Sequence, residues 1–240
     1  MSNSIVTISL TSLALSLTPA LLVLLIFTRW SLNITNSVYA LTRMLSQLLL
    51  VGYALAFIFE SQDSSLILFI LCVMCVASSW IALGSIKEYR TTLYQHAFFA
   101  IFLASGLTLT LITQGVLTLD PWYAPHYMIP IAGMIFAGSM NSVSLAAERF
   151  HSELQNNTYI PARNIAFQAA MIPVVNSLFA VGLVSLPGMM TGQILSGISP
   201  FIAARYQIMV MAMIFGASGL STALYLSFVK SFYSRLNYEL

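Results

Sequence analysis

The chain has 240 residues, of which 59% are hydrophobic and only 7% are charged. Soluble domains carry about 25% charged residues, so this composition excludes an ordinary water-soluble globular protein and predicts a lipid bilayer as the surroundings. The formal net charge is +2, and the nine basic residues are scattered along the chain. Because this pattern lacks the basic footprint that holds a nucleic-acid backbone, we expect no nucleic-acid partner.

Seven stretches are predicted to cross a membrane, because a helix needs about 20 mostly apolar residues to span a hydrocarbon core of about 30 Å. In chain order they are residues 5–27, 38–59, 65–86, 97–119, 128–147, 169–190 and 206–229. Residues 1–4 lack the positive charge of a secretory signal, so the first stretch is expected to remain in the protein. We therefore predict an all-α, polytopic transmembrane bundle of about seven helices, forming a single domain over residues 1–240.

The basic residues predict how the spans are oriented, because Lys and Arg are retained on the cytoplasmic side of short loops. With the N-terminus outside, eight of the nine basic residues fall at cytoplasmic ends and only Arg205 lies outside. The eight are Arg29, Arg43, Lys87, Arg90, Arg149, Arg163, Lys230 and Arg235. The distribution predicts an external N-terminus and a cytoplasmic C-terminus.

The longest polar segment, residues 148–168, is predicted on the cytoplasmic side and is too short for a domain. The chain has no Gly-rich phosphate loop ending in Lys-Ser or Lys-Thr, so any ATP energy has to come from a partner subunit. It also lacks a His-Glu-x-x-His or Gly-x-Ser-x-Gly motif. We therefore expect a protein that is not an enzyme and that binds no cofactor itself.

The most unusual stretch is residues 181–192, where Pro187 and several glycines interrupt an apolar span. One interpretation is a helix that ends in an external turn at Pro187 and Gly188. The other is a re-entrant or cavity-lining element, because broken helices in membranes tend to line substrate routes. Met189 and Met190 can ligate soft metals or fill a packed core, so metal ligands are left open.

Small and polar residues inside the spans predict how helices meet. Asn141, Ser139 and Ser142 are expected to hydrogen-bond across helices more often than to bind ligands. Small residues spaced by four, in residues 133–137, 188–192 and 212–216, are expected to permit close helix approach. Cys72 and Cys75 share one helical face and are interpreted as small buried side chains.

Several patterns spread along the chain identify a resemblance. They are VGLVSLPGMMTG at residues 181–192, RYQIMV at 205–210, IPIAGM at 129–134, and Arg43, Gln47, Leu48 and Val51-Gly52-Tyr53 in the second span. With these patterns the chain resembles, nearly end to end, the FetB/YbbM permease family. Members of this family are bacterial membrane subunits linked to iron export, with plant relatives in aluminium tolerance.

The resemblance implies an ABC transporter permease of the cell inner (plasma) membrane that exports iron or another metal. Such a permease works as a homodimer with a separate cytoplasmic ATPase subunit, which binds the ATP. The substrate route would involve Asn176, Ser177, Met189 and Met190, with Arg43 and Gln47 in the second span. The ATPase would dock on residues 148–168, with coupling through Glu148, Arg149, Glu153 and Arg163.

Two departures from the family pattern keep other functions open. The coupling segment is shortened around residues 156–161, and Asn176 and Phe179 stand where relatives carry an Asp and a nearby Lys. One alternative is an ATP-independent channel or secondary carrier, and another is a membrane scaffold that has lost transport. Copurification of an ATPase would favour the ABC permease over the channel or carrier.

Overall fold

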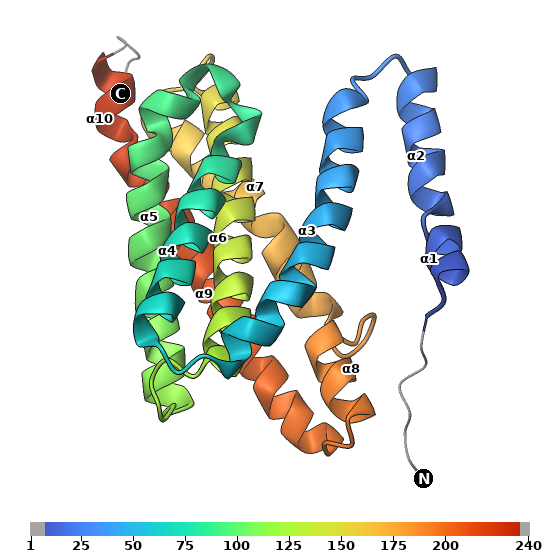
Figure 1. Cartoon of the computed structure of the whole chain (residues 1–240). Helices are drawn as coiled ribbons and strands as arrows, with labels where there is room; N and C mark the ends of the chain where they lie inside the picture. Colours follow the sequence, from blue (N-terminus) through green and yellow to red (C-terminus); the bar gives the residue numbers. More distant parts are fainter. Residues whose placement is uncertain (1–7, 236–240) are drawn as a thin grey trace. The chain divides into compact units, whose positions relative to one another are not determined.

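The computed structural model describes residues 8–235 of the chain, with side chains for residues 8–233, and this part is α-helical (Figure 1). The described residues contain no β-strand, and one isolated β-bridge joins Val181 and Ser185. The chain divides into two compact units, Met1–Ser61 and Gln62–Leu240. The predicted all-α fold class is confirmed.

The first unit contains α1 (Leu10–Ser16), α2 (Thr18–Arg29) and α3 (Thr35–Glu60). Ser9 caps α1, because its hydroxyl oxygen accepts a hydrogen bond of 3.1 Å from the Ser12 amide. Pro19 stands in the first turn of α2, where the missing N–H has no partner to lose. No residue of these three helices is buried, although most of their side chains are apolar.

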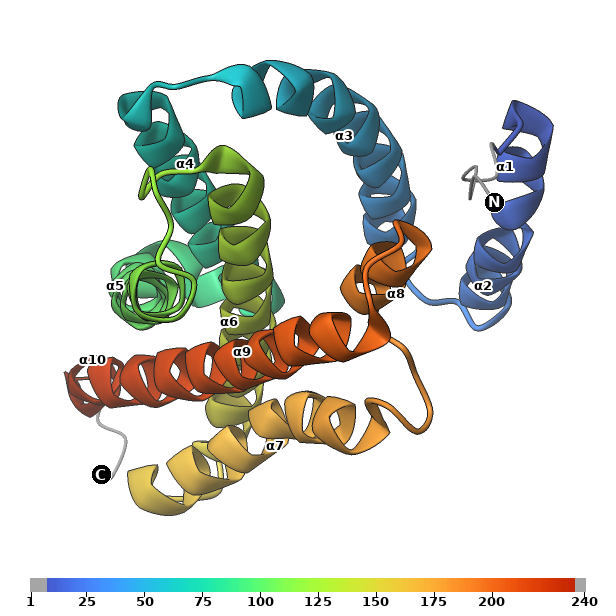
Figure 2. The same ribbon diagram turned by 90° about the horizontal axis from the view of Figure 1, so that it is seen from below.

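The second unit is a helical bundle built around α6 (Pro125–Glu153). The helices that pack on α6 are α4 (Ser64–Ala82), α5 (Arg90–Thr110), α7 (Tyr159–Ala180) and α9 (Pro200–Phe228). Figure 2 shows α6 in the midst of these four helices. Shorter elements complete the unit: the 3-10 turns η1 (Leu83–Ser85) and η2 (Lys87–Tyr89), the π-helix η3 (Leu111–Val116), α8 (Gly188–Leu195) and α10 (Lys230–Arg235).

Small side chains set the close approach of α6 to its neighbours. A Cβ atom added at Gly138 would lie 3.0 Å from the Ser218 hydroxyl oxygen and 3.2 Å from the Ile214 Cγ2 atom, both on α9. The adjacent Ser139 hydroxyl oxygen lies 3.1 Å from that of Ser105 on α5 and donates to the Ala217 carbonyl oxygen at 3.3 Å. These contacts confirm that Ser139 hydrogen-bonds across helices.

The predicted small-residue contacts are only partly found within the chain. A Cβ at Gly133 would meet the Met74 Cε atom of α4 at 3.5 Å, an ordinary packing contact. At Gly188, Gly192 and Gly216 a Cβ would have no atom within 4 Å, so no close helix approach occurs there. The tightest approach is instead at Gly138, which the sequence did not single out.

Six helical segments among the described residues are long and apolar enough to cross a membrane, one fewer than predicted. They are Leu10–Arg29, Thr35–Glu60, Ser64–Ser85, Lys87–Val116, Pro125–Glu153 and Pro200–Tyr233. The prediction of a continuous span at 169–190 is wrong, because α7 starts at Tyr159 and ends at Ala180. Gly182 then turns the chain with a left-handed φ of 82°, which glycine adopts without strain, before α8 begins. Residues 5–7 of the first predicted span lie outside the described range, and most of the remainder forms α1 and α2.

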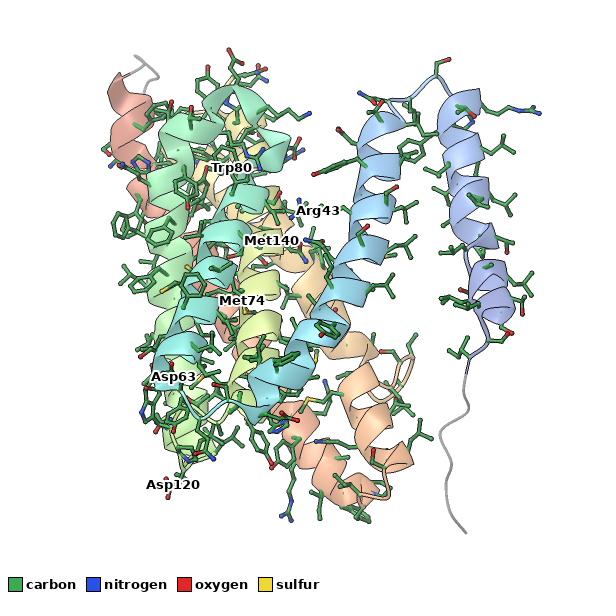
Figure 3. The ribbon with its side chains drawn as sticks, viewed as in Figure 1. Arg43, Asp63, Met74, Trp80, Asp120 and Met140 are labelled. Atoms are coloured by element: carbon green, nitrogen blue, oxygen red, sulfur yellow. The ribbon has the colours of Figure 1, made fainter. Side chains whose placement is uncertain are left out.

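Two polar contacts, at Asp63 and at Arg90, lie toward opposite ends of the second unit. Asp63 and Asp120 lie at one end, and Trp80 lies toward the other (Figure 3). Asp63 caps α4 by accepting a hydrogen bond of 2.8 Å from the Ser65 amide. Beside Trp80, the Arg90 guanidinium donates hydrogen bonds of 2.6 and 3.0 Å to the Trp80 carbonyl oxygen and lies 4.0 Å from its ring centroid.

Candidate functional site

Helices α7 and α9 run antiparallel, and three cavities follow each other along their contact. The first cavity has a volume of about 330 Å³ and lies between residues 163–168 of α7 and 223–227 of α9. The middle cavity, of about 260 Å³, lies where residues 170–177 of α7 meet α6 and α9. The last cavity, of about 480 Å³, lies beside the break between α7 and α8. We call this series the α7–α9 row.

The first cavity is polar on its α7 side. Arg163, Asn164 and Gln168 line it from the first turns of α7, and Ser227 lines it from α9. The Arg163 guanidinium is held by Asn164, whose Oδ1 accepts two hydrogen bonds of 2.8 and 3.1 Å. The first turns of α7 therefore carry a cluster of polar groups ahead of its apolar part. These polar groups explain why α7 is not among the six apolar spans.

The middle cavity combines neutral polar groups with a distorted helix. Asn141 and Ser142 line it from α6, and Pro173 and Ser177 line it from α7. Proline has no N–H, so Pro173 leaves the carbonyl group four residues earlier without its helical partner. The Ser177 hydroxyl donates to the Pro173 carbonyl oxygen at 2.9 Å. The polar groups of the middle cavity, at the centre of the row, are therefore uncharged backbone and side-chain groups.

The last cavity is largely apolar but contains a buried amide. Gln207 of α9 is only 6% exposed, and its Oε1 atom has no hydrogen-bond partner. Met190 of α8 lines the same cavity, and Met211 of α9 lines both the middle and the last cavities. Buried polar atoms in native proteins usually have partners, so the hydrogen bonding of the Gln207 side chain is incomplete in this structure. Sequence reasoning used Gln207 only as part of the RYQIMV pattern.

The structure separates the residues predicted for the substrate route. Ser177 and Met190 line the row, whereas Asn176 and Met189 are not among the residues that line its three cavities. Arg43 and Gln47 belong to α3 in the other unit, where both are exposed. With its amide turned to satisfy both groups, Gln47 accepts two hydrogen bonds of 3.2 and 3.3 Å from the Arg43 guanidinium.

The predicted coupling segment forms a helical hairpin without a separate helix of its own. Glu148, Arg149 and Glu153 lie in the last turns of α6, and Arg163 lies in the first turns of α7. Glu153 binds the Arg149 guanidinium at 2.7 Å and accepts a hydrogen bond of 2.8 Å from the Asn157 side chain. The hairpin turn is therefore held by its own charged and amide groups, while Glu148 is exposed.

The hairpin is braced against α9 by buried aromatic side chains. The Tyr159 hydroxyl donates a hydrogen bond of 3.1 Å to the Leu226 carbonyl oxygen. Phe150 packs edge-on against the rings of Tyr159 and Tyr233, with centroids 5.8 and 5.4 Å apart. Leu226 also lines the first cavity, so the Tyr159 hydrogen bond connects the hairpin to the start of the α7–α9 row.

Comparison with known proteins gives a family match. The family model described as "Uncharacterised protein family (UPF0014)" matches residues 10–233. The chain is 36% identical to the "Probable iron export permease protein FetB" of Escherichia coli, over 93% of this chain and 92% of that protein. It is 35% identical to the "UPF0014 membrane protein slr1647" of Synechocystis, over 80% of each chain. It is 28% identical to the "Protein ALUMINUM SENSITIVE 3" of Arabidopsis thaliana, over 77% of this chain and 72% of that one. No solved structure matches the chain.

Proposed function

Because the chain belongs to the UPF0014 family and is a multi-pass membrane protein, we propose that it is the transmembrane permease subunit of an ABC-type exporter. Its proposed substrate is iron, which the name of the Escherichia coli relative gives for that protein, or another metal. A separate cytoplasmic ATPase would supply the energy, and two copies of the chain would form the permease in the cell inner membrane. The protein is then a transport subunit and not an enzyme.

The α7–α9 row is the observation that carries this proposal. Helix α7 has 22 residues, and at 1.5 Å per residue it is about 33 Å long, which matches a hydrocarbon core of about 30 Å. The row follows α7 from Arg163 to Leu178 and continues to Met190 of α8. Irregular backbone at membrane depth is tolerated where it lines a cavity, and the Pro173 distortion and the Gly182 turn both border the row.

The hairpin of residues 148–168 is the proposed docking site for the ATPase. Movement of this hairpin would be passed to α9 through the Tyr159–Leu226 hydrogen bond and the Phe150 contacts. The first cavity would change shape with it, because Arg163 and Leu226 both line that cavity. Glu148, Arg149, Glu153 and Arg163 are the proposed coupling residues, and they offer charges of both signs to a partner.

The residues that line the row indicate whether a metal would pass as a bare ion or bound to a chelator. No group of three or more His, Cys, Asp or Glu able to hold a metal occurs among the described residues. Hard ions such as iron prefer carboxylate, imidazole and water ligands, whereas the row offers amides, hydroxyls, thioethers and the Arg163 guanidinium. A metal whose charge is already balanced by a chelator suits such a lining, which has no carboxylate, better than a bare cation.

The proposal is tested by purifying the full chain with its interacting proteins in mild detergent and reconstituting them into vesicles. We expect an ATPase to copurify and iron to leave the cytoplasmic-side compartment only when ATP is present. Iron movement without any ATPase or ATP would support a channel or secondary carrier instead. Binding of an ATPase without movement of iron or a chelate, in a preparation where a known ABC exporter works, would support a scaffold.

A further inference from the structure

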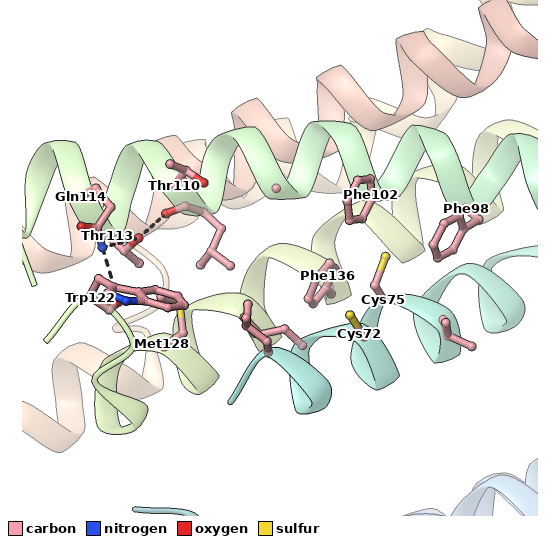
Figure 4. Close-up of a pocket in the computed structure, with 15 residues that line it drawn as sticks. Cys72, Cys75, Phe98, Phe102, Thr110, Thr113, Gln114, Trp122, Met128 and Phe136 are labelled. Carbon is pink, nitrogen blue, oxygen red and sulfur yellow. Dashed lines mark hydrogen bonds between the residues drawn. The ribbon is translucent and has the colours of Figure 1, made fainter. Parts of the chain in front are cut away.

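A second elongated cavity lies on a different face of the bundle, between α5 and the helices α4 and α6 (Figure 4). Its volume is about 450 Å³, within the range of ligand pockets. Phe98, Phe102, Gly106, Leu109 and Thr113 line it at spacings of three or four residues, so they form one continuous stripe along α5 and into η3. It shares no lining residue with the α7–α9 row.

Polar groups occur at one end of this cavity. Figure 4 shows Thr110, Thr113, Gln114 and Trp122 together at that end, whereas the sulfur atoms of Cys72 and Cys75 lie with aromatic rings at the other. The Gln114 amide donates to the Trp122 carbonyl oxygen at 3.4 Å and to the Thr113 hydroxyl at 3.5 Å. These bonds are long, since N–H···O distances cluster near 2.9 Å, so the amide can still bind another acceptor.

The dimensions describe a slot for a thin, long molecule. From Phe98 to Gln114 the stripe runs 16 residues along the α5–η3 helix, or about 24 Å at 1.5 Å per residue. One leaflet of a hydrocarbon core is about 15 Å deep, so the slot extends from the end of a span past the middle of the membrane. Gln114 and Trp122 lie beside the turn that joins η3 to α6, at the end of the bundle.

The slot opens toward the surroundings of the bundle. Phe102 is 49% exposed, Val76 is 48% exposed and Leu68 is 47% exposed, and all three line it. In a multi-pass membrane protein these side chains face lipid, so a molecule can enter sideways from the bilayer. The side chains that line an empty slot have no atoms to contact on that side, so they lose dispersion energy. Filling the slot with an apolar chain restores these contacts.

We propose that this slot binds one acyl chain of a membrane phospholipid, with the head group placed at Gln114 and Trp122. The apolar stripe accepts the chain, and the Gln114 amide with the indole of Trp122 meets the ester and phosphate groups at the membrane interface. The site does not depend on the function proposed above, because no part of the α7–α9 row contributes to it.

Gly106 offers a position at which the slot can be obstructed. It lines the slot, and a Cβ atom there would have no atom within 4 Å, so Gly106→Phe is the variant chosen to fill the slot. Gly216 of α9 is the matched control, since it is also a mid-helix glycine with open space around a Cβ and lies outside the slot. Both variants replace helical glycine and add the same ring.

The test uses the full chain in lipid nanodiscs with a phospholipid that carries a photoreactive diazirine near the end of one acyl chain. After illumination, mass spectrometry maps the adducts. We expect saturable labelling of peptides that contain Cys72, Cys75 or Phe102, reduced about tenfold by Gly106→Phe, which corresponds to about 1.4 kcal/mol of binding, and unchanged by Gly216→Phe. A diazirine near the carboxyl carbon should instead label peptides that contain Gln114.

Three outcomes would overturn the proposal. One is equal labelling of Gly106→Phe and Gly216→Phe. A second is labelling of the wild-type chain that never saturates, which indicates only unspecific contact with surrounding lipid. The third is labelling by a diazirine fatty acid that unlabelled phospholipid does not reduce, which makes a free fatty acid the occupant. Because saturation is measured on the wild-type chain, the proposal can fail even if Gly106→Phe does not fold.

Discussion

The close approach of α6 and α9 at Gly138 predicts a stability difference between two glycine variants of the same bundle. Ala is favoured over Gly in a helix by about 1 kcal/mol, so Gly216→Ala, which adds a methyl group into open space, should stabilise the protein by about that amount. Gly138→Ala gains the same propensity but brings Cβ within 3.0 Å of Ser218 Oγ and 3.2 Å of Ile214 Cγ2. Overpacking of this kind costs about 1–3 kcal/mol.

The two variants should therefore differ by about 1–3 kcal/mol, or about 2–12 °C in melting temperature at about 2–4 °C per kcal/mol. Differential scanning fluorimetry of both proteins in one detergent measures this difference. Adding Ser218→Ala to Gly138→Ala should recover part of the loss, because it removes one of the two close atoms and Ser218 Oγ has no hydrogen-bond partner to lose. Equal melting temperatures for Gly138→Ala and Gly216→Ala would refute the packing argument.

Three further predictions concern the hairpin and the α7–α9 row. Tyr159→Phe removes the hydrogen bond to Leu226, so it should lower the free energy of unfolding by about 1 kcal/mol, measured by thermal unfolding. It should also reduce ATP-driven transport, measured by export from vesicles. Glu153→Gln should change the free energy of unfolding by no more than about 0.5 kcal/mol, because its partner Arg149 is 48% exposed. The same variant should weaken copurification of the ATPase. Unchanged copurification would show that Glu153 is not a coupling residue. Gln207→Leu removes a buried unpaired oxygen, so stability should hold while export falls; normal export would show that the amide does not contact substrate.

The sequence was sufficient for the membrane class and for most spans, because long apolar runs in this chain coincide with helices. It failed at residues 169–190, where apolar composition continues through a backbone break. Hydropathy does not register that Gly182 adopts a left-handed φ, nor that helix α7 extends back to Tyr159 through Arg163 and Asn164. Neither interpretation of residues 181–192 placed the helix end at Ala180.

The candidate site was harder to predict because it depends on which helices pair. The α7–α9 row brings Ser177 together with Met211 and Asn141, residues separated by tens of positions in sequence. Ser177 and Met190 were predicted from the family resemblance and line the row, whereas Gln207 was overlooked because an amide in an apolar helix has no distinctive spacing. Burial of Gln207 without a partner is visible only after the helices are packed.

The most direct test of the account is to block the α7–α9 row at the residue that joins two of its cavities. Met211→Trp should fill the boundary between the middle and last cavities, whereas Leu220→Trp places the same ring on a part of α9 that is 46% exposed and lies outside the row. Vesicles containing the chain and its copurified ATPase are assayed for ATP-dependent iron export. The account predicts loss of export with Met211→Trp, retained ATPase binding, and normal export with Leu220→Trp. Normal export by a folded Met211→Trp protein would contradict it.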